Sequence, residues 1–306
     1  MKIGCENIDR LVNVSIRSPG MPRGAMTELY EAAKGENAIS YDIVQSLLAK
    51  PGARIAIFTG ASVPNHLPNG ENDGPMGSAV LGRALEKLGY AVTIFTEREV
   101  LESQRAFTRI LGSEVAIEEL LRDPTDQHAR IAQEFDIGIT VEKAGGNREG
   151  LLHSINANVR TGTRANIDAL IAALNAAGKL TVGIGDGGNE IGFGKVYDLA
   201  REILPYGDTI VTVVATEYLY PVAISNWGAY ALAAGLAIGA DRPDLTVTPE
   251  EERAMLEKAI ELDCRDGGTG RAEFAVDGVS GASSMAYVQL LREIVTATLT
   301  PYSRDF

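Results

Sequence analysis

The 306-residue sequence is poor in cysteine, histidine and positive charge. Its two cysteines, Cys5 and Cys264, fit no zinc-binding pattern, which predicts free thiols in a reducing compartment. The three histidines stand in no metal-ligand or triad spacing, so no nucleophile pattern emerges. Lys and Arg number 28 against 41 Asp and Glu, a formal net charge of −13. A nucleic-acid partner is therefore not expected, because a polyanion needs a basic face.

Long uninterrupted apolar runs are also absent. Charged residues (Glu6, Asp9 and Arg10) interrupt the apolar core that a signal peptide would need. The longest apolar stretch, residues 230–240, is much shorter than the roughly 20 residues that span a bilayer. We therefore expect a cytoplasmic protein without a membrane partner. Apolar residues still make up 45% of the chain, which allows a full core and argues against disorder.

Five nearly continuous apolar, β-branched runs predict strands that are buried on both faces of a parallel sheet. They are residues 54–60, 91–96, 136–142, 180–186 and 209–216. Helical spacing of apolar residues lies between them, and a helix start is predicted at Thr248, with proline in its first turn. The predicted helices include residues 76–88 and 163–177.

This alternation predicts a doubly wound α/β fold with a mostly parallel sheet and helices on both faces. We expect a single domain over residues 1–306. Within it, residues 1–50 should form a mostly helical cover at one end of the sheet. Residues 51–300 should contain the sheet core and the site loops. Ligands of such folds bind beyond the carboxyl ends of the strands.

The strongest motif at a predicted strand end is IGDGGNEIGFGK, residues 184–195. A buried strand delivers Asp186 into a glycine-rich loop. Its further candidate residues are Gly187, Gly188, Asn189 and Glu190. Carboxylate and amide oxygens suit a hard cation, which predicts Mn²⁺ or Mg²⁺ on Asp186 and Glu190. Alternatively, Asp186 caps a helix and Glu190 pairs with an arginine.

Two other known motifs partly match this loop. Residues 183–188 match G-x-G-x-x-G, but they follow a late strand, so no nucleotide cofactor is expected. The loop also resembles a late motif of haloacid-dehalogenase-like phosphatases. Their early nucleophilic aspartate pair is not matched, because the nearest candidate, Asp136, starts a strand and is followed by Gly138. A metal-dependent hydrolase or phosphatase is the alternative function.

Two clusters precede this loop in the sequence. Glu71, Asp73 and Gly74 come just before a predicted helix, where acid–base groups, metal ligands or a plain solvated turn would fit. Glu142 and Lys143 are adjacent at the end of a predicted strand. They are either catalytic candidates or members of a surface ion pair. The substrate-binding candidates after them are Gly145 and Asn147. The arginines Arg148, Arg160 and Arg164 could hold a substrate carboxylate, but surface ion pairs are favoured.

Two clusters follow the loop. Asn226 could place an amide at the site, while Trp227, the single tryptophan, is better suited to packing a wall. Asp266 and Asp277 lie in glycine-rich turns, whose backbone amides could form nests for a carboxylate. Surface hairpin turns are the equal alternative.

The motifs share an order with one known family. IGDGGNEIGFGK, ENDGPMGSAVLGRALEKLGY, VEKAGGN, SNWGAYAL and AVDGVSG, from about residue 54 to 290, resemble the D-glutamate cyclase-like C-terminal family. The resemblance implies a lyase that closes D-glutamate to 5-oxo-D-proline with loss of water. In the animal enzyme this domain follows a second, unrelated one. Lys143 stands where the family tends to have arginine, which loses a bidentate fork for a carboxylate.

Such a cyclisation needs a base for the substrate ammonium, a role open to Glu71, Asp73 or Glu190. It also needs positive charge on the attacked carboxylate, from Lys143 or from a metal on Asp186 and Glu190. The expected partner is a small amino or carboxylic acid, and a homo-oligomer is compatible with the sequence. A non-catalytic small-acid binding or sensor protein stays open as a further alternative.

Overall fold

Six parallel strands form the central sheet. A computed structural model describes residues 1–17, 25–123, 126–301 and 303–304. The strands are β1 (Arg54–Phe58), β2 (Ala91–Thr96), β3 (Ala116–Glu119), β4 (Ile137–Val141), β5 (Leu180–Gly185) and β6 (Tyr218–Pro221). Their order is β3-β2-β1-β4-β5-β6, and every neighbouring pair is parallel. The order reverses between β1 and β4, where a doubly wound sheet has its ligand crevice.

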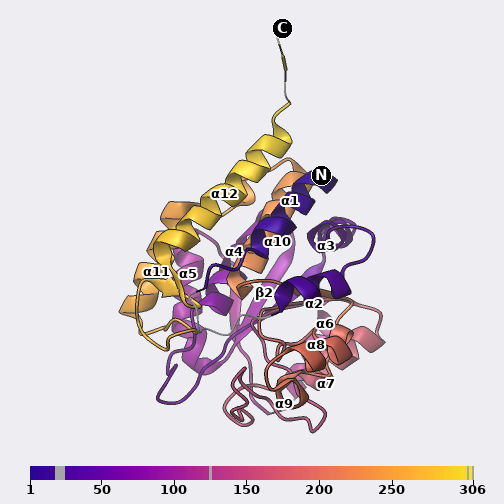
Figure 1. Ribbon diagram of the computed structural model, residues 1–306, viewed down its shortest axis with the longest axis vertical. Coiled ribbons are helices and arrows are strands. Elements are labelled where there is room, and N and C mark those ends of the chain that lie inside the picture. Colours follow the sequence, from indigo (N-terminus) through magenta and orange to yellow (C-terminus); the bar gives the residue numbers. More distant parts are fainter. Residues whose placement is uncertain (18–24, 124–125, 302, 305–306) are drawn as a thin grey trace.

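Helices cover both faces of this sheet, as the sequence predicts (Figure 1). Alternate residues of a strand point to opposite faces, so Ile57 joins one core cluster and Phe58 another. The larger cluster contains residues of α1 (Lys2–Val12), α3 (Ile39–Leu48), α4 (Asp73–Lys87), α5 (Leu101–Ile110), α10 (Ser225–Ala240), α11 (Pro249–Glu261) and α12 (Gly281–Leu299). The smaller contains residues of α6 (Asp126–Glu134) and α7 (Asp168–Ala176).

Helix α10 is buried along almost its whole length, from Ser225 to Ile238. It is rich in alanine and glycine and has no polar face, as expected of a helix surrounded by protein. Its contact with α4 is close, since a Cβ on Gly77 would lie 2.9 Å from the Cα of Asn226. This packing sets the first residues of two helices, Asp73 of α4 and Ser225 of α10, at the carboxyl edge of the sheet.

Helices α1, α2 (Met26–Ala33) and α3 contain most of the described residues among the first fifty. Helices α1 and α3 pack on α10, while α2 and α3 pack along the edge strand β6. Helices α2, α8 (Tyr197–Ile203) and α9 (Gly207–Ile210) share a third apolar cluster with Leu219 of β6. Helix α1 also runs beside α12 (Figure 1).

Short elements complete the described chain. They are the 3₁₀ helices η1 (Arg98–Val100), η2 (Gly194–Val196) and η3 (Pro243–Leu245), and the hairpin of β7 (Ala275–Val276) and β8 (Val279–Ser280). The predicted start at Thr248 is confirmed by a capping box, in which Thr248 and Glu251 each accept the other's backbone N–H. Within the described ranges, no helix has both the length and the apolar character that a membrane crossing requires.

The predicted strand at residues 209–216 is wrong. Thr209 and Ile210 belong to α9, and the sixth strand begins only at Tyr218. The intervening residues belong to no strand, although Ala215 forms isolated bridges with Gly192 and Phe193, and they support two loops instead. The Val213 N–H donates to the Gly146 carbonyl at 2.9 Å, and the Gly192 N–H donates to the Val214 carbonyl at 2.8 Å. Strands β3 and β6, four residues each, were not predicted.

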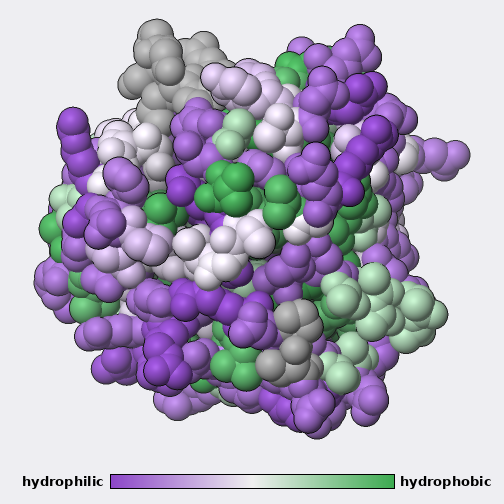
Figure 2. Space-filling model, turned by 90° about the horizontal axis from the view of Figure 1, so that it is seen from below, coloured by the Kyte–Doolittle hydropathy of each residue, from purple (hydrophilic) through white to green (hydrophobic). Residues whose placement is uncertain are grey.

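Polar residues dominate the face that Figure 2 shows, with small apolar groups between them. This view looks at the end of the molecule that lies at the bottom of Figure 1. An excess of charged and polar surface is expected for a chain with a formal net charge of −13.

Candidate active site

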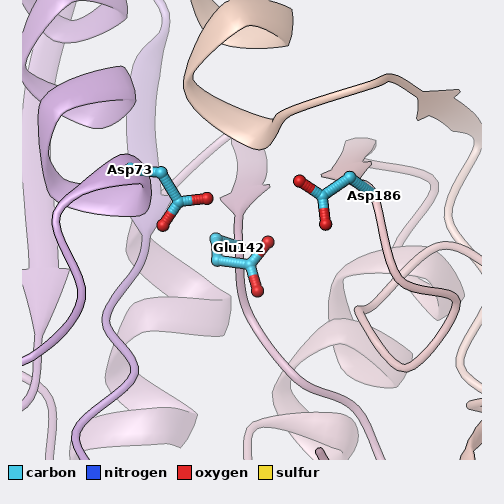
Figure 3. Close-up of side chains that lie close together, drawn as sticks. All are labelled: Asp73, Glu142 and Asp186. Carbon is cyan, nitrogen blue, oxygen red and sulfur yellow. The ribbon is translucent and has the colours of Figure 1, made fainter. Parts of the chain in front are cut away.

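Three carboxylates converge at the carboxyl edge of the central strands (Figure 3). Asp73 begins the helix after β1, Glu142 follows β4, and Asp186 follows β5. One carboxylate oxygen from each lies within 4.8 Å of the other two. Strands β1 and β4 flank the point where the strand order reverses, so the cluster occupies the crevice expected for a ligand.

Helix α10 holds two of these carboxylates in place through its first residue. The Ser225 hydroxyl donates to Glu142 Oε2 at 2.6 Å, and the Ser225 backbone N–H donates to Asp186 Oδ2 at 3.1 Å. The backbone of Glu142 adopts a left-handed φ of 50°. This conformation is unfavourable for a residue with a side chain, and such strain is concentrated at functional sites. The cluster is therefore built by the fold and not by a flexible surface loop.

A cavity of about 360 Å³ lies against this cluster. Its walls combine five carboxylates with three arginines among the described residues. The acidic residues are Glu71, Glu142, Asp186, Glu190 and Asp277, and the basic ones are Arg17, Arg160 and Arg164. Apolar walls come from Val63, Leu67, Ile155, Leu204 and Ile210. A small ligand with both an ammonium and a carboxylate matches this mixture of charges.

Burial and mutual repulsion weaken the acidity of these carboxyl groups. Burial is the larger cause and raises the pKa of both Glu71 and Glu190 to about 7, with the Asp186 charge adding to both. Burial also raises the pKa of Asp73 and of Glu142 well above the usual range, and neighbouring carboxylates add to this. Arg17 opposes the rise for Asp186. A bound cation would relieve this repulsion.

In the glycine-rich loop after β5, the Glu190 side chain points back toward the backbone of the same loop. Its carboxylate accepts hydrogen bonds from the Gly187 N–H at 3.0 and 3.2 Å and from the Gly188 N–H at 2.8 Å. Glu190 still lines the cavity, but the close cluster found among the described residues contains Asp73, Glu142 and Asp186 instead. Space is tight here, since a Cβ on Gly187 would lie 2.5 Å from Ile155.

Asn189 also lies in the cavity wall, and its amide is oriented by the loop before α7. Its Nδ2 donates to the His153 carbonyl at 2.9 Å. Its Oδ1 is buried and accepts no hydrogen bond from a described residue. Asn189 thus presents an acceptor suited to a substrate ammonium.

Lys143 and the residues after it face away from the cavity. Lys143 forms a buried ion pair with Glu97, which follows β2. Asn147 stabilises the loop that contains it, because its Oδ1 accepts hydrogen bonds from the N–H groups of Glu149 and Leu151. The Gly145 N–H donates to the Asn189 carbonyl at 2.9 Å, so this loop supports the glycine-rich loop.

Gly74, Asn226 and Trp227 are not among the residues that line the cavity. Gly74 is in the first turn of α4, where a Cβ would lie 3.0 Å from the Cβ of Glu142. Asn226 and Trp227 are buried in the first turn of α10, and Trp227 stacks on Tyr287 with ring centroids 4.1 Å apart. Trp227 therefore packs an internal wall between helices α10 and α12.

The two aspartates in the late glycine-rich turns differ in placement. Asp266 is buried and accepts the Thr269 and Gly278 N–H groups, each at 2.8 Å, so it ties two turns together. Asp277 lines the cavity and forms an ion pair with Arg17. Gly267 and Gly268 line the same wall.

Several cavity residues escaped the sequence analysis. Arg17 donates to Asp186 Oδ2 at 2.8 Å across 169 positions, and no local pattern marks it. Ser225 was seen only as part of the SNWG motif. For Arg160 and Arg164 the favoured surface ion pair is wrong, because neither forms an ion pair within the described part of the chain, and Arg164 is only 7% exposed.

The fold and the site define a doubly wound α/β protein with a small-ligand cavity at the switch point of its sheet. The chain belongs to the family described as "D-glutamate cyclase-like, C-terminal", whose sequence model matches residues 22–292. It is 31% identical over 193 residues to the human protein "D-glutamate cyclase, mitochondrial". That match covers 57% of this chain and 31% of the human protein.

Proposed function

We propose that this protein is a lyase that closes D-glutamate to 5-oxo-D-proline with loss of water. The family and the printed name of the human relative support this reaction class. The observation that carries the proposal is a cavity whose wall combines carboxylates with arginines, as a zwitterionic amino dicarboxylate requires. Cys5 and Cys264 are buried free thiols, which is consistent with the proposed cytoplasmic setting.

A divalent cation, Mn²⁺ or Mg²⁺, fits the convergent carboxylates as part of this proposal. Asp73, Glu142 and Asp186 would hold it, with Glu142 and Asp73 taking the place that the sequence analysis assigned to Glu190. The fit rests on hard oxygen donors within 4.8 Å of one another and on Asp73 Oδ1, which is buried without a hydrogen-bond partner among the described residues. Such an ion supplies Lewis-acid polarisation of a bound carboxylate.

Among the acids of the site, Glu71 is the best placed to accept a proton from the substrate ammonium. It lines the cavity, and its Oε1 is buried without a hydrogen-bond partner in the described part of the chain. Glu190 is less suited, because three backbone hydrogen bonds already engage its carboxylate. Asn189 Oδ1 would orient the same ammonium group through a hydrogen bond.

The proposed reaction joins the two ends of one short molecule. The deprotonated amine attacks the carbon of the γ-carboxylate, a C–N bond forms, and one γ C–O bond breaks. The two protons that the nitrogen gives up leave with that oxygen as water. The apolar and charged walls of the cavity would hold the substrate in a folded pose, which makes the attack intramolecular and well oriented.

The test is a turnover assay on chelator-stripped protein with D-glutamate or L-glutamate, with and without Mn²⁺ or Mg²⁺. Chiral chromatography separates the 5-oxoproline enantiomers. We expect metal-dependent 5-oxo-D-proline, and a loss of roughly 100-fold or more in Glu142→Gln and Asp186→Asn. The control is Asp198→Asn, an exposed residue outside the cavity. Absence of product from folded, metal-loaded protein would overturn the lyase proposal, and binding without turnover would indicate a sensor.

A further inference from the structure

Two arginines in the cavity wall have no anionic partner among the described residues. Arg160 and Arg164 both lie in the segment between β4 and α7, and both line the cavity beside Glu71. Arg164 is 7% exposed, and the Nε atoms of both arginines are buried without a hydrogen-bond partner in the described chain. In contrast, Arg17, which lines the same cavity, pairs with Asp186 and Asp277.

This arrangement is costly for the unliganded protein. A guanidinium does not deprotonate in proteins, so burial leaves a fixed charge that needs a counter-ion. The two charges also repel each other, since burial and then the neighbouring Arg164 lower the pKa of Arg160. Glu71 is close enough to influence both groups, yet it forms an ion pair with neither. An anion that enters the cavity would satisfy both guanidinium groups.

We infer that Arg160 and Arg164 form the subsite for the α-carboxylate of the substrate. Arginine suits this task, because its planar donors match the geometry of a carboxylate. The inference rests on the proposed function for the identity of the ligand, D-glutamate. Independently of that identity, both arginines line a cavity whose wall also contains Glu142 and Asp186 of the carboxylate cluster.

The choice between the two carboxylates of glutamate follows from the reaction. The γ-carboxylate becomes a neutral amide, so it must gain electrophilic character. The cation proposed at the carboxylate cluster would supply that character as a Lewis acid, which leaves the arginines for the other carboxylate. The α-carboxylate keeps its negative charge from substrate to product, and a permanent cationic pair stabilises it throughout. The γ-carboxylate would then extend toward Asp73, Glu142 and Asp186, where the cation is proposed.

The test uses two ligands that differ only in which carboxylate is present. D-Glutamine keeps the α-carboxylate, whereas D-isoglutamine keeps the γ-carboxylate and carries an amide at the α position. Calorimetry would measure the affinity of each for the wild type, Arg160→Gln and Arg164→Gln. The matched control is Arg148→Gln, because Arg148 is exposed and stacks over Tyr197 at 4.7 Å, outside the cavity wall.

We expect Arg160→Gln and Arg164→Gln to weaken D-glutamine binding by about 10- to 100-fold, as for the loss of a charge-assisted hydrogen bond. Their affinity for D-isoglutamine should stay within about twofold of the wild type, and Arg148→Gln should change neither. Unchanged D-glutamine affinity, or a loss confined to D-isoglutamine, would overturn the assignment. Circular dichroism checks folding. If Arg164→Gln does not fold, the result for Arg160→Gln alone tests the assignment, since Arg160 is the more exposed residue.

The outcome is separable from that of the lyase proposal, because calorimetry on chelator-stripped protein, in which no turnover is expected, reports only the binding of the two probes. Arginine-dependent D-glutamine binding in a protein that forms no 5-oxo-D-proline would keep the subsite and reject the reaction. Normal turnover with an unchanged KM for D-glutamate in both arginine variants would keep the reaction and reject the subsite.

Discussion

Lys143 forms an ion pair with Glu97 in the interior of the protein, where their side chains are 1% and 0% exposed. The adjacent Glu142 instead faces the cavity. The left-handed backbone of Glu142, with φ of 50°, directs these sequence neighbours apart. Lys143 reaches past the end of β1 to the residue that follows β2. This relationship assigns Lys143 to the framework beneath the site.

Removing one partner of this pair should destabilise the protein severely. Lys143→Met leaves the Glu97 carboxylate buried and unpaired, which we expect to cost about 3–5 kcal/mol in the free energy of unfolding. Urea denaturation measures it. Lys258→Met is the control, since Lys258 pairs with Glu261 at the surface and its loss should cost under about 1 kcal/mol. A Lys143→Met protein with unchanged stability but no turnover would instead show that Lys143 acts in the chemistry.

The sheet was largely predictable because most of its strands are buried on both faces. Continuous apolar runs therefore coincide with β1, β2, β4 and β5. Glu142 and Asp186 were found by the same logic, since each follows a central strand. The run at residues 209–216 misled the prediction because it is apolar and β-branched, yet its backbone hydrogen bonds serve loops and not a strand.

The rest of the site depends on contacts that no local pattern encodes. Arg17 meets Asp186 only after the chain has passed through β1 to β5. The partner of Lys143 likewise follows a strand two places away in the sheet. Only the side-chain positions show that Asp73 and Glu142, and not Glu190, lie close to Asp186. The glycine-rich loop folds so that the Glu190 carboxylate accepts hydrogen bonds from the backbone amides of that same loop.

Metal binding should stabilise the folded protein against heat. An ion that binds only the folded state at a free concentration 100 times its Kd adds about 2.7 kcal/mol. We expect Mn²⁺ to raise the Tm of chelator-stripped protein in proportion to its logarithmic concentration, and Asp73→Asn to shift this response to higher Mn²⁺. The exposed Asp198→Asn should respond like the wild type. Identical titrations for Asp73→Asn and wild type would contradict the three-carboxylate site.

The glycine-rich loop packs directly on the strand beneath it, which predicts a steric effect at Gly183. A Cβ there would lie 2.2 Å from the Ile191 carbonyl oxygen and 2.9 Å from the Gly192 Cα. Gly183→Ala should therefore push the loop away from β5, cost about 1–3 kcal/mol in stability and weaken Mn²⁺ binding. Gly35→Ala is the matched control, since no atom lies within 4 Å of its added Cβ. Equal stability of the two variants would show that the loop adjusts freely.

The buried carboxyl group of Glu252 should make stability depend on pH. It is 0% exposed on α11 and accepts hydrogen bonds from the Tyr230 hydroxyl at 2.7 Å and the Ser284 hydroxyl at 2.6 Å. Burial raises its pKa from 4.5 to about 7, against the effect of both hydrogen bonds. Between these values the folded state retains a proton that the unfolded chain has released. Stability contributed by this proton is complete below pH 4.5 and is lost as the pH rises through about 7.

Glu252→Gln removes the ionisable group while keeping nearly the same shape. The unfolding free energy of the wild type relative to this variant should fall by up to about 3 kcal/mol between pH 4.5 and 7, since one pKa unit is worth about 1.4 kcal/mol. Urea denaturation across this range measures the difference. Glu257→Gln, an exposed change on the same helix, should leave the profile parallel to that of the wild type. A parallel profile for Glu252→Gln as well would mean that the carboxyl group titrates alike in the folded and unfolded states, and the hydrogen bonds would then offset its burial.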